Sequence, residues 1–165
     1  MPLLKPHRYF TRISNIDPRA DLADAGIRVL LLDMDNTLLT RDTHEVPEDV
    51  RAWLQSVRAA GIRPCLLTNN WHQAAFDWAD RLDMPVVAKA LKPLPFSYAR
   101  ALRLMGVKRR EVACIGDQLM TDIWGGKLAG MHTFMVDPLV SADLKHTLFL
   151  RKFEAKVMRD FEPEC

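Results

Sequence analysis

The chain has 165 residues, 48% of them hydrophobic, which suits one compact domain with a single buried core. Its formal net charge of +2 is too small to indicate a nucleic-acid partner. Its most strongly hydrophobic run is far shorter than the roughly 20 residues that a membrane-spanning helix needs. Three cysteines without a closely spaced pair indicate reduced thiols rather than disulfides. We therefore expect a soluble, cytoplasmic protein, with peripheral contact to a membrane left open.

Hydrophobic runs typical of strands alternate with amphipathic stretches typical of helices from residue 27 onward. In chain order, the predicted elements are a strand over 27–32, a helix over 47–60, a strand over 62–67, a helix over 71–82, a strand over 85–88, a helix over 95–105, a strand over 112–115, a helix over 121–129 and a strand over 133–136. Repeated strand–helix units of this length predict an α/β fold, a Rossmann-like parallel sheet with helices on both faces.

A last helix is predicted over residues 143–161. Its hydrophobic face would consist of Leu150, Phe153, Val157 and Phe161, and its other face is basic, with Arg151, Lys152, Lys156 and Arg159. We expect the hydrophobic face to dock on the core, and attachment to an anionic membrane surface is the alternative. The whole chain, 1–165, would then be one domain, with its core at about 25–140 and with the N-terminal segment and the tail helix packed on it.

Polar side chains follow three of the predicted strands. Asp33 follows the first strand, Thr68 and Asn69 follow the second, and Asp117 follows the fourth. Because a parallel α/β sheet binds its ligands at the carboxyl ends of its strands, we expect these side chains to share one site.

Two acidic pairs belong to this site, Asp33 with Asp35 and Asp117 with Asp122. Like charges about 4 Å apart repel by roughly 4 kcal/mol at an effective dielectric constant of 20, so a cation is expected between them. Mg²⁺ suits a few carboxylates together with phosphate and water. Taken alone, each acidic pair could equally form a turn or a helix cap. An EF-hand is excluded, because its required glycine and glutamate positions are occupied by other residues.

The remaining predicted site residues suit a phosphate group. Thr68 and Asn69 offer a hydroxyl and an amide to phosphate oxygens. Lys92 can neutralise both the phosphate and a nucleophile, as phosphoryl transfer requires. Its neighbour Lys89 leaves the assignment of the lysine open, and either one could be an ordinary surface lysine.

In their order and in their amino-acid sequences, these segments resemble the four motifs of the haloacid dehalogenase (HAD) superfamily. The segments are Asp33-Met34-Asp35-Asn36-Thr37-Leu38, Leu67-Thr68-Asn69-Asn70, Ala90-Leu91-Lys92-Pro93 and Gly116-Asp117-Gln118 with Thr121-Asp122. The sequences in and around the motifs are similar to those of YqeG-type phosphatases of subfamily IIIA, and the resemblance runs over most of the chain.

The resemblance implies a phosphatase that works through an aspartyl-phosphate. Asp33 would be the nucleophile and Asp35 the general acid and base. Thr68 and Lys92 would bind the phosphoryl group.

It also implies a Mg²⁺ site held by Asp33, by the main-chain carbonyl of Asp35 and by Asp117. Asp122 would support Lys92 or the metal shell, and Thr37 would steady the motif loop.

The gaps between these motifs each hold only one helix and its loops, so we expect no sizeable cap domain over the site. An uncovered site favours a large or surface-bound substrate, or a lid from another subunit of an oligomer. The resemblance points to a lipid head group as substrate, that of phosphatidylglycerophosphate, and a soluble or macromolecular phosphoester is the alternative. Two other classes of function are a phospho-accepting receiver domain and a scaffold used only for binding. In a receiver domain the phosphorylated aspartate follows a middle strand, whereas here Asp33 and Asp35 follow the first strand and a second acidic pair comes late in the chain, which argues against a receiver. The presence of Asp33, Asp35, Lys92 and Asp117 together argues against a scaffold used only for binding.

Overall fold

The computed structural model describes residues 2–141 and 147–165. Within these residues lies one six-stranded sheet, in which all neighbouring strands are parallel and the order is β1-β6-β5-β2-β3-β4. The strands are β1 (Arg8–Phe10), β2 (Val29–Leu32), β3 (Arg63–Leu67), β4 (Val86–Val87), β5 (Val112–Gly116) and β6 (His132–Val136). The five strands predicted from the sequence are all present.

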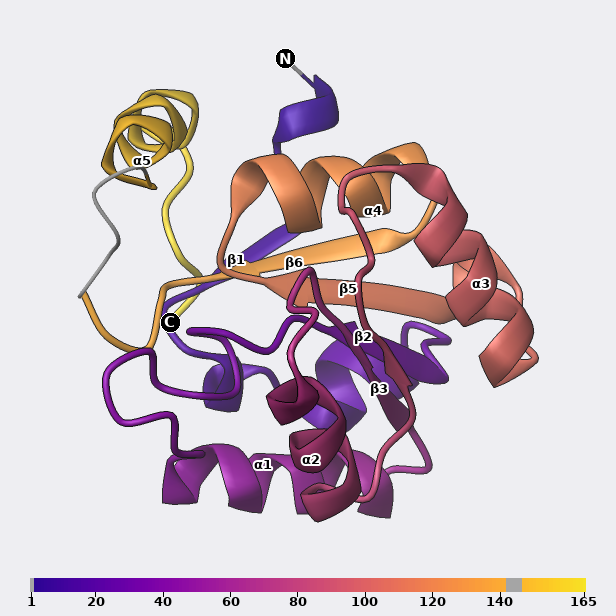
Figure 1. Cartoon of the computed structure of the whole chain (residues 1–165). Helices are drawn as coiled ribbons and strands as arrows, with labels where there is room; N and C mark the ends of the chain where they lie inside the picture. Colours follow the sequence, from indigo (N-terminus) through magenta and orange to yellow (C-terminus); the bar gives the residue numbers. More distant parts are fainter. Residues whose placement is uncertain (1, 142–146) are drawn as a thin grey trace.

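Helices cover both faces of the sheet, α1 and α2 on one and α3 and α4 on the other (Figure 1). The α-helices are α1 (Glu48–Ala59), α2 (Gln73–Arg81), α3 (Pro95–Met105), α4 (Trp124–Leu128) and α5 (Thr147–Val157). Shorter helical turns are η1 (Pro2–Leu4), η2 (Ile13–Asn15), η3 (Pro18–Ala23), η4 (Arg109–Glu111) and η5 (Leu119–Ile123). The parallel sheet with helices on both faces confirms the predicted Rossmann-like α/β class. The described residues form no cap domain.

The central strand β2 shows why the sheet needs helices on both sides. Leu30 and Leu32 belong to the hydrophobic cluster that includes α1 and α2, whereas Val29 and Leu31 belong to the cluster that includes α3. All four side chains are buried. A strand that is buried on both faces reads as a continuous hydrophobic run, which is why the sequence revealed it.

The edge strand β1 was not predicted from the sequence. It has three residues and pairs within the sheet only with β6, so its side-chain alternation is too short to give a signal. Its other side is engaged by the end of the chain: the main-chain N–H of Glu164 donates to the Tyr9 carbonyl (2.7 Å), and the N–H of Thr11 donates to the Cys165 carbonyl (2.8 Å). The last residues of the chain therefore lie alongside β1.

The prediction for the tail helix was partly wrong. Residues 143–146 of the predicted range lie outside the described residues, and α5 ends at Val157, before Phe161. On α5 the Phe153 side chain is exposed (40%), whereas Glu154 is buried (5%). Hydrophobic spacing misassigned Phe153 and Glu154 because polar contacts hold Glu154: it accepts from the Leu119 main-chain N–H (2.7 Å) and pairs with Arg151 (3.3 Å).

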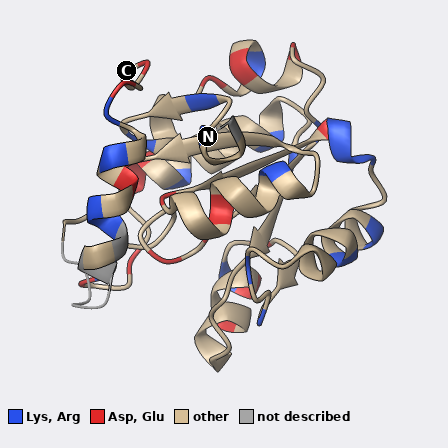
Figure 2. Ribbon diagram, turned by 90° about the horizontal axis from the view of Figure 1, so that it is seen from above, with Lys and Arg blue, Asp and Glu red and all other residues tan. Residues whose placement is uncertain are grey.

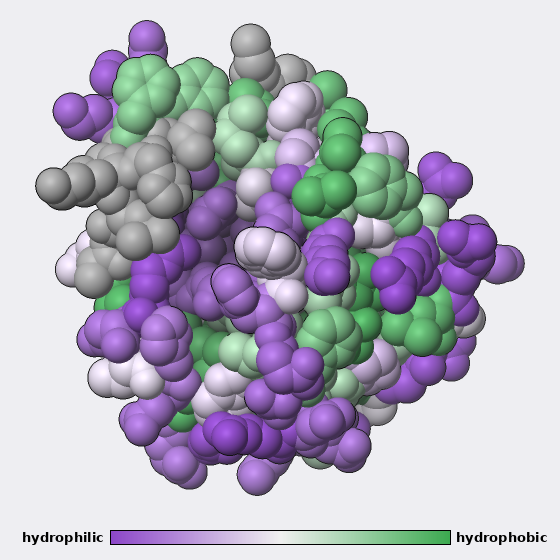
Figure 3. Space-filling view, viewed as in Figure 1, coloured by the Kyte–Doolittle hydropathy of each residue, from purple (hydrophilic) through white to green (hydrophobic). Residues whose placement is uncertain are grey.

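The surface around α5 combines charge and hydrophobicity. Figure 2 shows Lys and Arg along the helix that joins the grey trace, and Figure 3 shows hydrophobic atoms over the same part of the molecule, at the upper left. Phe149 is exposed (79%), more than any other large hydrophobic side chain that the structure describes. In the described part of the chain, no helix has both the length and the hydropathy required to cross a membrane.

Candidate active site

The sequence-predicted site residues converge at the carboxyl edge of the sheet. Asp33 follows β2, Thr68 follows β3, and Asp117 follows β5, three strands that are neighbours in the sheet. The main-chain N–H of Asp33 donates to the Ile115 carbonyl of β5 (3.0 Å), which fixes the end of β2 beside the end of β5.

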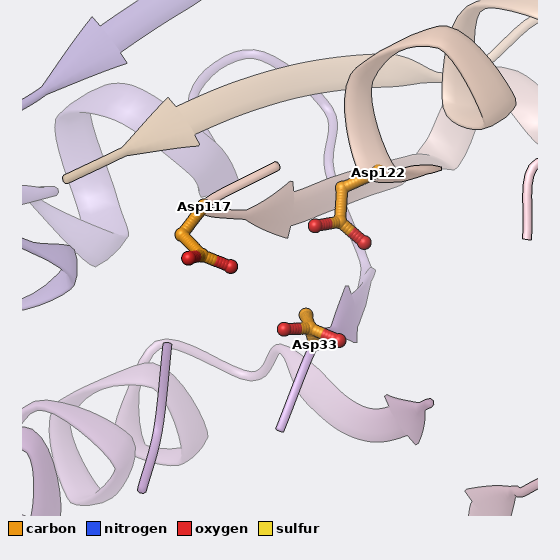
Figure 4. Close-up of side chains that lie close together, drawn as sticks. All are labelled: Asp33, Asp117 and Asp122. Carbon is orange, nitrogen blue, oxygen red and sulfur yellow. The ribbon is translucent and has the colours of Figure 1, made fainter. Parts of the chain in front are cut away.

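Three carboxylates form the centre of the site. Asp33, Asp117 and Asp122 each offer an oxygen atom, and these oxygens lie within 4.8 Å of one another (Figure 4). Burial raises the pKa of Asp117, and the nearby charges of Asp33 and Asp122 raise it further. Burial likewise raises the pKa of Asp122, and Lys92 opposes that rise. The cluster therefore holds more negative charge than its surroundings comfortably stabilise.

Lys92 lies within this acidic cluster. Its Nζ atom is 2.7 Å from Asp33 Oδ1 and 2.5 Å from Asp122 Oδ1, and its side chain is only 3% exposed. Burial alone would lower the pKa of Lys92, but the charges of Asp122 and Asp33 outweigh burial and raise it, so the amine stays charged. The side chain of Lys89, by contrast, lies exposed at the surface. The geometry thus selects Lys92 of the two candidate lysines.

The side chain of Asp35 stands outside the three-carboxylate cluster. Burial and the charge of Asp33 raise the pKa of Asp35, opposed by the Asn70 amide, which donates to Asp35 Oδ2 at 3.5 Å. A carboxyl group that holds its proton more tightly than usual is suited to donate it to a leaving group.

Two threonines lie where the sequence placed them. The Thr37 hydroxyl donates to Asp33 Oδ2 (3.4 Å), so it touches the carboxylate it was expected to steady. The buried Thr68 hydroxyl accepts a hydrogen bond from the main-chain N–H of Asn70 (3.0 Å), which shapes the loop after β3.

The amide of Asn69 is engaged with Lys92. Its Oδ1 accepts from the main-chain N–H of Lys92 (2.6 Å), and its Nδ2 donates to the Lys92 carbonyl (3.3 Å). The loop that it holds is strained, because Lys89 (φ 51°) and Leu91 (φ 54°) adopt left-handed backbone conformations that such residues rarely take. Asn69 therefore links the loop after β3 to the loop that carries Lys92. Direct phosphate binding by Asn69 stays a prediction.

Sequence reasoning gave no role to two further residues at the site. Asn36 has a left-handed backbone (φ 65°), and its amide exchanges two hydrogen bonds with the main chain of Val140, at 2.9 and 3.0 Å. An asparagine within a motif loop is a recognisable signal for such a turn. Arg151 of α5 contacts Asp117, more than 30 residues away in sequence, and no sequence pattern announces this contact.

The carboxylate cluster is suited to a hard divalent cation. Three carboxylate residues converge, and Asp117 Oδ1 is buried without a hydrogen-bond partner in the described part of the chain. An orphaned, buried carboxylate oxygen is costly unless a cation satisfies it. Oxygen ligands of this kind fit Mg²⁺, which the sequence also favours.

Known proteins match this chain along most of its length. The family described as haloacid dehalogenase-like hydrolase matches residues 9–130. "Probable phosphatase YqeG" from Bacillus subtilis (strain 168) is 31% identical over 153 residues, which span 93% of this chain and 88% of that protein.

Solved structures share the fold at lower sequence identity. An uncharacterized protein from Listeria monocytogenes serotype 4b has a TM-score of 0.57 and 16% identity, covering 76% of this chain and 99% of that one. The cobalt-bound deoxy-D-mannose-octulosonate 8-phosphate phosphatase from Haemophilus influenzae has a TM-score of 0.55 and 12% identity, covering 82% of this chain and 89% of that one. The family match over residues 9–130, together with the relative that spans nearly the whole chain, shows that this protein belongs to the haloacid dehalogenase-like hydrolases.

Proposed function

We propose that this phosphatase cleaves phosphomonoesters in two steps through an aspartyl-phosphate on Asp33, with Mg²⁺ as cofactor. The observation that carries the proposal is the bridge made by Lys92 Nζ between Asp33 and Asp122 inside the acidic cluster. A nucleophilic carboxylate that must approach a phosphate dianion needs a fixed positive charge beside it, and Lys92 supplies one.

In the first step, a carboxylate oxygen of Asp33 attacks phosphorus, and a new bond joins this oxygen to phosphorus. The bond from phosphorus to the leaving oxygen breaks, and Asp35 gives its proton to that oxygen. Lys92 and the Thr68 hydroxyl bind the phosphoryl oxygens during this transfer.

In the second step, Asp35 takes a proton from water, whose oxygen then attacks phosphorus. The bond between Asp33 and phosphorus breaks, which releases phosphate and restores the Asp33 carboxylate. Asp33, Asp117 and the main-chain carbonyl of Asp35 would hold Mg²⁺, and Asp122 would keep Lys92 in place. When bound, Mg²⁺ neutralises charge on the phosphate and on the surrounding carboxylates.

The relatives support a phosphatase over the other classes of function. The Bacillus subtilis relative is named a probable phosphatase, and the Haemophilus influenzae structure is that of a sugar-phosphate phosphatase with cobalt bound. Asp33, Asp35, Lys92 and Asp117 are all present, which a scaffold used only for binding has no chemical reason to retain.

Hydrolysis of p-nitrophenyl phosphate tests the proposal. We expect activity that requires Mg²⁺ and that Asp33→Asn abolishes, because an amide cannot serve as the nucleophile. Asp42→Asn is the matched control, since Asp42 is an exposed acid in the following loop. Activity that persists in Asp33→Asn would refute the proposed nucleophile.

We further propose a bulky substrate that is bound at a surface, with phosphatidylglycerophosphate as the first candidate. We take the chain to act as one domain with an uncapped site, at or near a membrane. The loops after β3 and β4, which carry Thr68, Asn69 and Lys92, and the start of α3 also expose large hydrophobic side chains: Trp71, Leu91, Leu94 and Phe96. Exposed hydrophobic residues beside a phosphate site suit a substrate that has a hydrophobic part next to its phosphate.

A side-by-side phosphate-release assay tests this choice of substrate. We expect faster turnover of phosphatidylglycerophosphate in mixed micelles than of soluble sugar phosphates. The double change Trp71→Ser with Leu91→Ser should reduce only the lipid activity. Equal turnover of lipid and sugar phosphates would refute lipid specificity and leave the phosphatase assignment intact.

A further inference from the structure

Helix α5 brings an arginine to the active site from outside the four motifs. Arg151 Nη2 donates to Asp117 Oδ2 at 2.6 Å, and Arg151 Nη1 donates to the Asp117 main-chain carbonyl at 2.9 Å. One guanidinium group therefore holds both the side chain and the main chain of the same aspartate. Such a paired contact fixes orientation as well as charge, because the fork of the guanidinium is rigid.

Glu154, one turn further along α5, holds this arginine and the following loop together. Its Oε2 is 3.3 Å from Arg151 Nη1, and its Oε1 accepts a hydrogen bond from the main-chain N–H of Leu119 at 2.7 Å. Leu119 is the first residue of η5, two residues beyond Asp117. Arg151 and Glu154, which we call the α5 arm, thus grip the loop at Asp117 and at Leu119.

The two carboxylate oxygens of Asp117 have different surroundings. Oδ2 accepts from Arg151, whereas Oδ1 is buried and has no hydrogen-bond partner among the residues that the structure describes. Figure 4 shows the Asp117 carboxylate turned toward Asp33 and Asp122. Contact with Arg151 at one oxygen restricts the rotation of the carboxylate and leaves the other oxygen available for a cation.

The residues at and after the C-terminal end of α5 hold the helix in place. Val157 and Met158 pack against the hydrophobic cluster of Leu4, Leu119, Ile123 and Met135, and the main chain of Glu164 is bonded to β1. Helix α5, which carries the α5 arm, is therefore attached to the rest of the fold through contacts that do not involve Asp117.

We propose that Arg151 and Glu154 are positioning residues that orient Asp117 as a ligand of the catalytic Mg²⁺. This inference rests on the proposed function, because it assumes that the carboxylate cluster holds the metal. Arg151 holds Oδ2 and the main-chain carbonyl, Glu154 holds Arg151 and Leu119, and Asp117 Oδ1 is presented to the cation. Residues that orient a metal ligand commonly change metal affinity about 10–100-fold when they are replaced.

Mg²⁺ binding to the full chain, measured by titration calorimetry without substrate, tests the inference. We expect Arg151→Gln to weaken Mg²⁺ binding about 10–100-fold. Arg151→Lys keeps the charge but loses the fork, so we expect it to restore only part of the affinity. Glu154→Gln retains an acceptor for Leu119 and should weaken binding less than Arg151→Gln does.

The matched control is Lys152→Gln, which removes one positive charge from the exposed neighbouring position on the same helix. We expect its Mg²⁺ affinity and melting temperature to equal those of the wild type. Arg151→Lys, which keeps a positive charge beside Asp117 and Glu154, provides a folded variant if Arg151→Gln melts early.

Kinetics separate a positioning residue from one that touches the substrate. For Arg151→Gln we expect the Mg²⁺ concentration for half-maximal activity to rise, with kcat largely restored and KM unchanged at saturating Mg²⁺. Unchanged or tighter Mg²⁺ binding in this variant, or a higher KM with unchanged Mg²⁺ affinity, would overturn the inference. A wild-type chain that binds no Mg²⁺ would instead refute the proposed function.

Discussion

Single residues of the site differ mainly in what surrounds each charge. Asp33 touches Lys92 and the Thr37 hydroxyl, a positive charge and a hydrogen-bond donor. Asp35 has a raised pKa because of burial and the charge of Asp33, an arrangement that favours the protonated acid. In the proposed mechanism, two carboxylates two positions apart therefore take opposite roles because their surroundings differ.

Asp35→Asn tests the role of the general acid and base. The amide keeps the shape of the side chain but neither donates the proton to the leaving oxygen nor accepts one from water. We expect kcat to fall about 10²–10⁴-fold. With p-nitrophenyl phosphate, whose leaving group needs little protonation, the phosphorylated enzyme should accumulate, which rapid acid quenching and intact mass would detect. Turnover at the wild-type rate would contradict this role.

Asn69→Ala tests the link between the two loops. The change removes both hydrogen bonds to the Lys92 main chain, so the strained loop can relax and carry Lys92 Nζ away from Asp33. We expect at least a tenfold loss of kcat and about 1 kcal/mol of lost stability, measured by steady-state kinetics and by denaturation in urea. A raised KM at unchanged stability would indicate instead that the Asn69 amide binds phosphate directly.

At the scale of elements, the close approach of β5 to η5 places the last two carboxylates. A Cβ atom on Gly116 would lie 2.3 Å from the Asp122 carboxylate carbon, so only glycine lets η5 pack this closely. The Gln118 main-chain N–H then donates to Asp122 Oδ2 (3.2 Å), which turns the carboxylate toward Lys92.

Gly116→Ala should therefore displace Asp122 and damage the site. We expect about 1–3 kcal/mol of lost stability and a loss of most activity, since Lys92 would lose one of its two partners. Gly106→Ala is the control: its Cβ meets no atom within 4 Å, so its left-handed φ should cost stability but not activity. A fully active Gly116→Ala enzyme would show that the position of Asp122 is unimportant.

The ion pair of Arg12, just before η2, with Asp49 of α1 makes a contribution to folding stability that depends on pH. Arg12 Nη2 donates to Asp49 Oδ1 (2.8 Å), and hydrogen bonding with Arg12 lowers the pKa of Asp49. A lowered pKa in the folded state stabilises the protein above the ordinary Asp value of about 4, and this stabilisation fades as the pH falls below that value. Because the pair is partly exposed, we expect about 0.5 kcal/mol.

Denaturation in urea of the wild type and Asp49→Asn measures this contribution. The variant should be less stable at pH 7, and the difference should shrink at pH 2–3. A difference that is constant from pH 7 to pH 2 would show that the carboxylate charge is not its source.

At the scale of the whole molecule, the sequence predicted the features that follow from patterns over a few neighbouring residues. Strands buried on both faces read as hydrophobic runs, and the polar residues after them mark the ligand edge of the sheet. Asp33, Thr68 and Asp117 could therefore be placed at that edge, and helix α1 could be predicted from its hydrophobic spacing.

Contacts between distant segments could not be predicted in this way. Strand β1 forms because β6 and the end of the chain pair with it on either side. The three residues of β1 contain no sequence pattern that indicates either partner. The buried Glu154 reads as a surface charge until Arg151 and the Leu119 N–H are placed beside it. Hydrophobic periodicity carries no information about such polar pairings.

Chemical trapping of the phosphorylated enzyme tests the central claim most directly. The full chain is mixed with p-nitrophenyl phosphate and Mg²⁺, quenched in acid and treated with borohydride, which reduces an acyl phosphate to homoserine, and the digested protein is then mapped by mass spectrometry. The mechanism predicts homoserine at position 33, and none in a sample without substrate. Reduction at another carboxylate, or phosphate release with no trapped intermediate under conditions where Asp35→Asn also yields none, would contradict the assignment of Asp33 as the nucleophile.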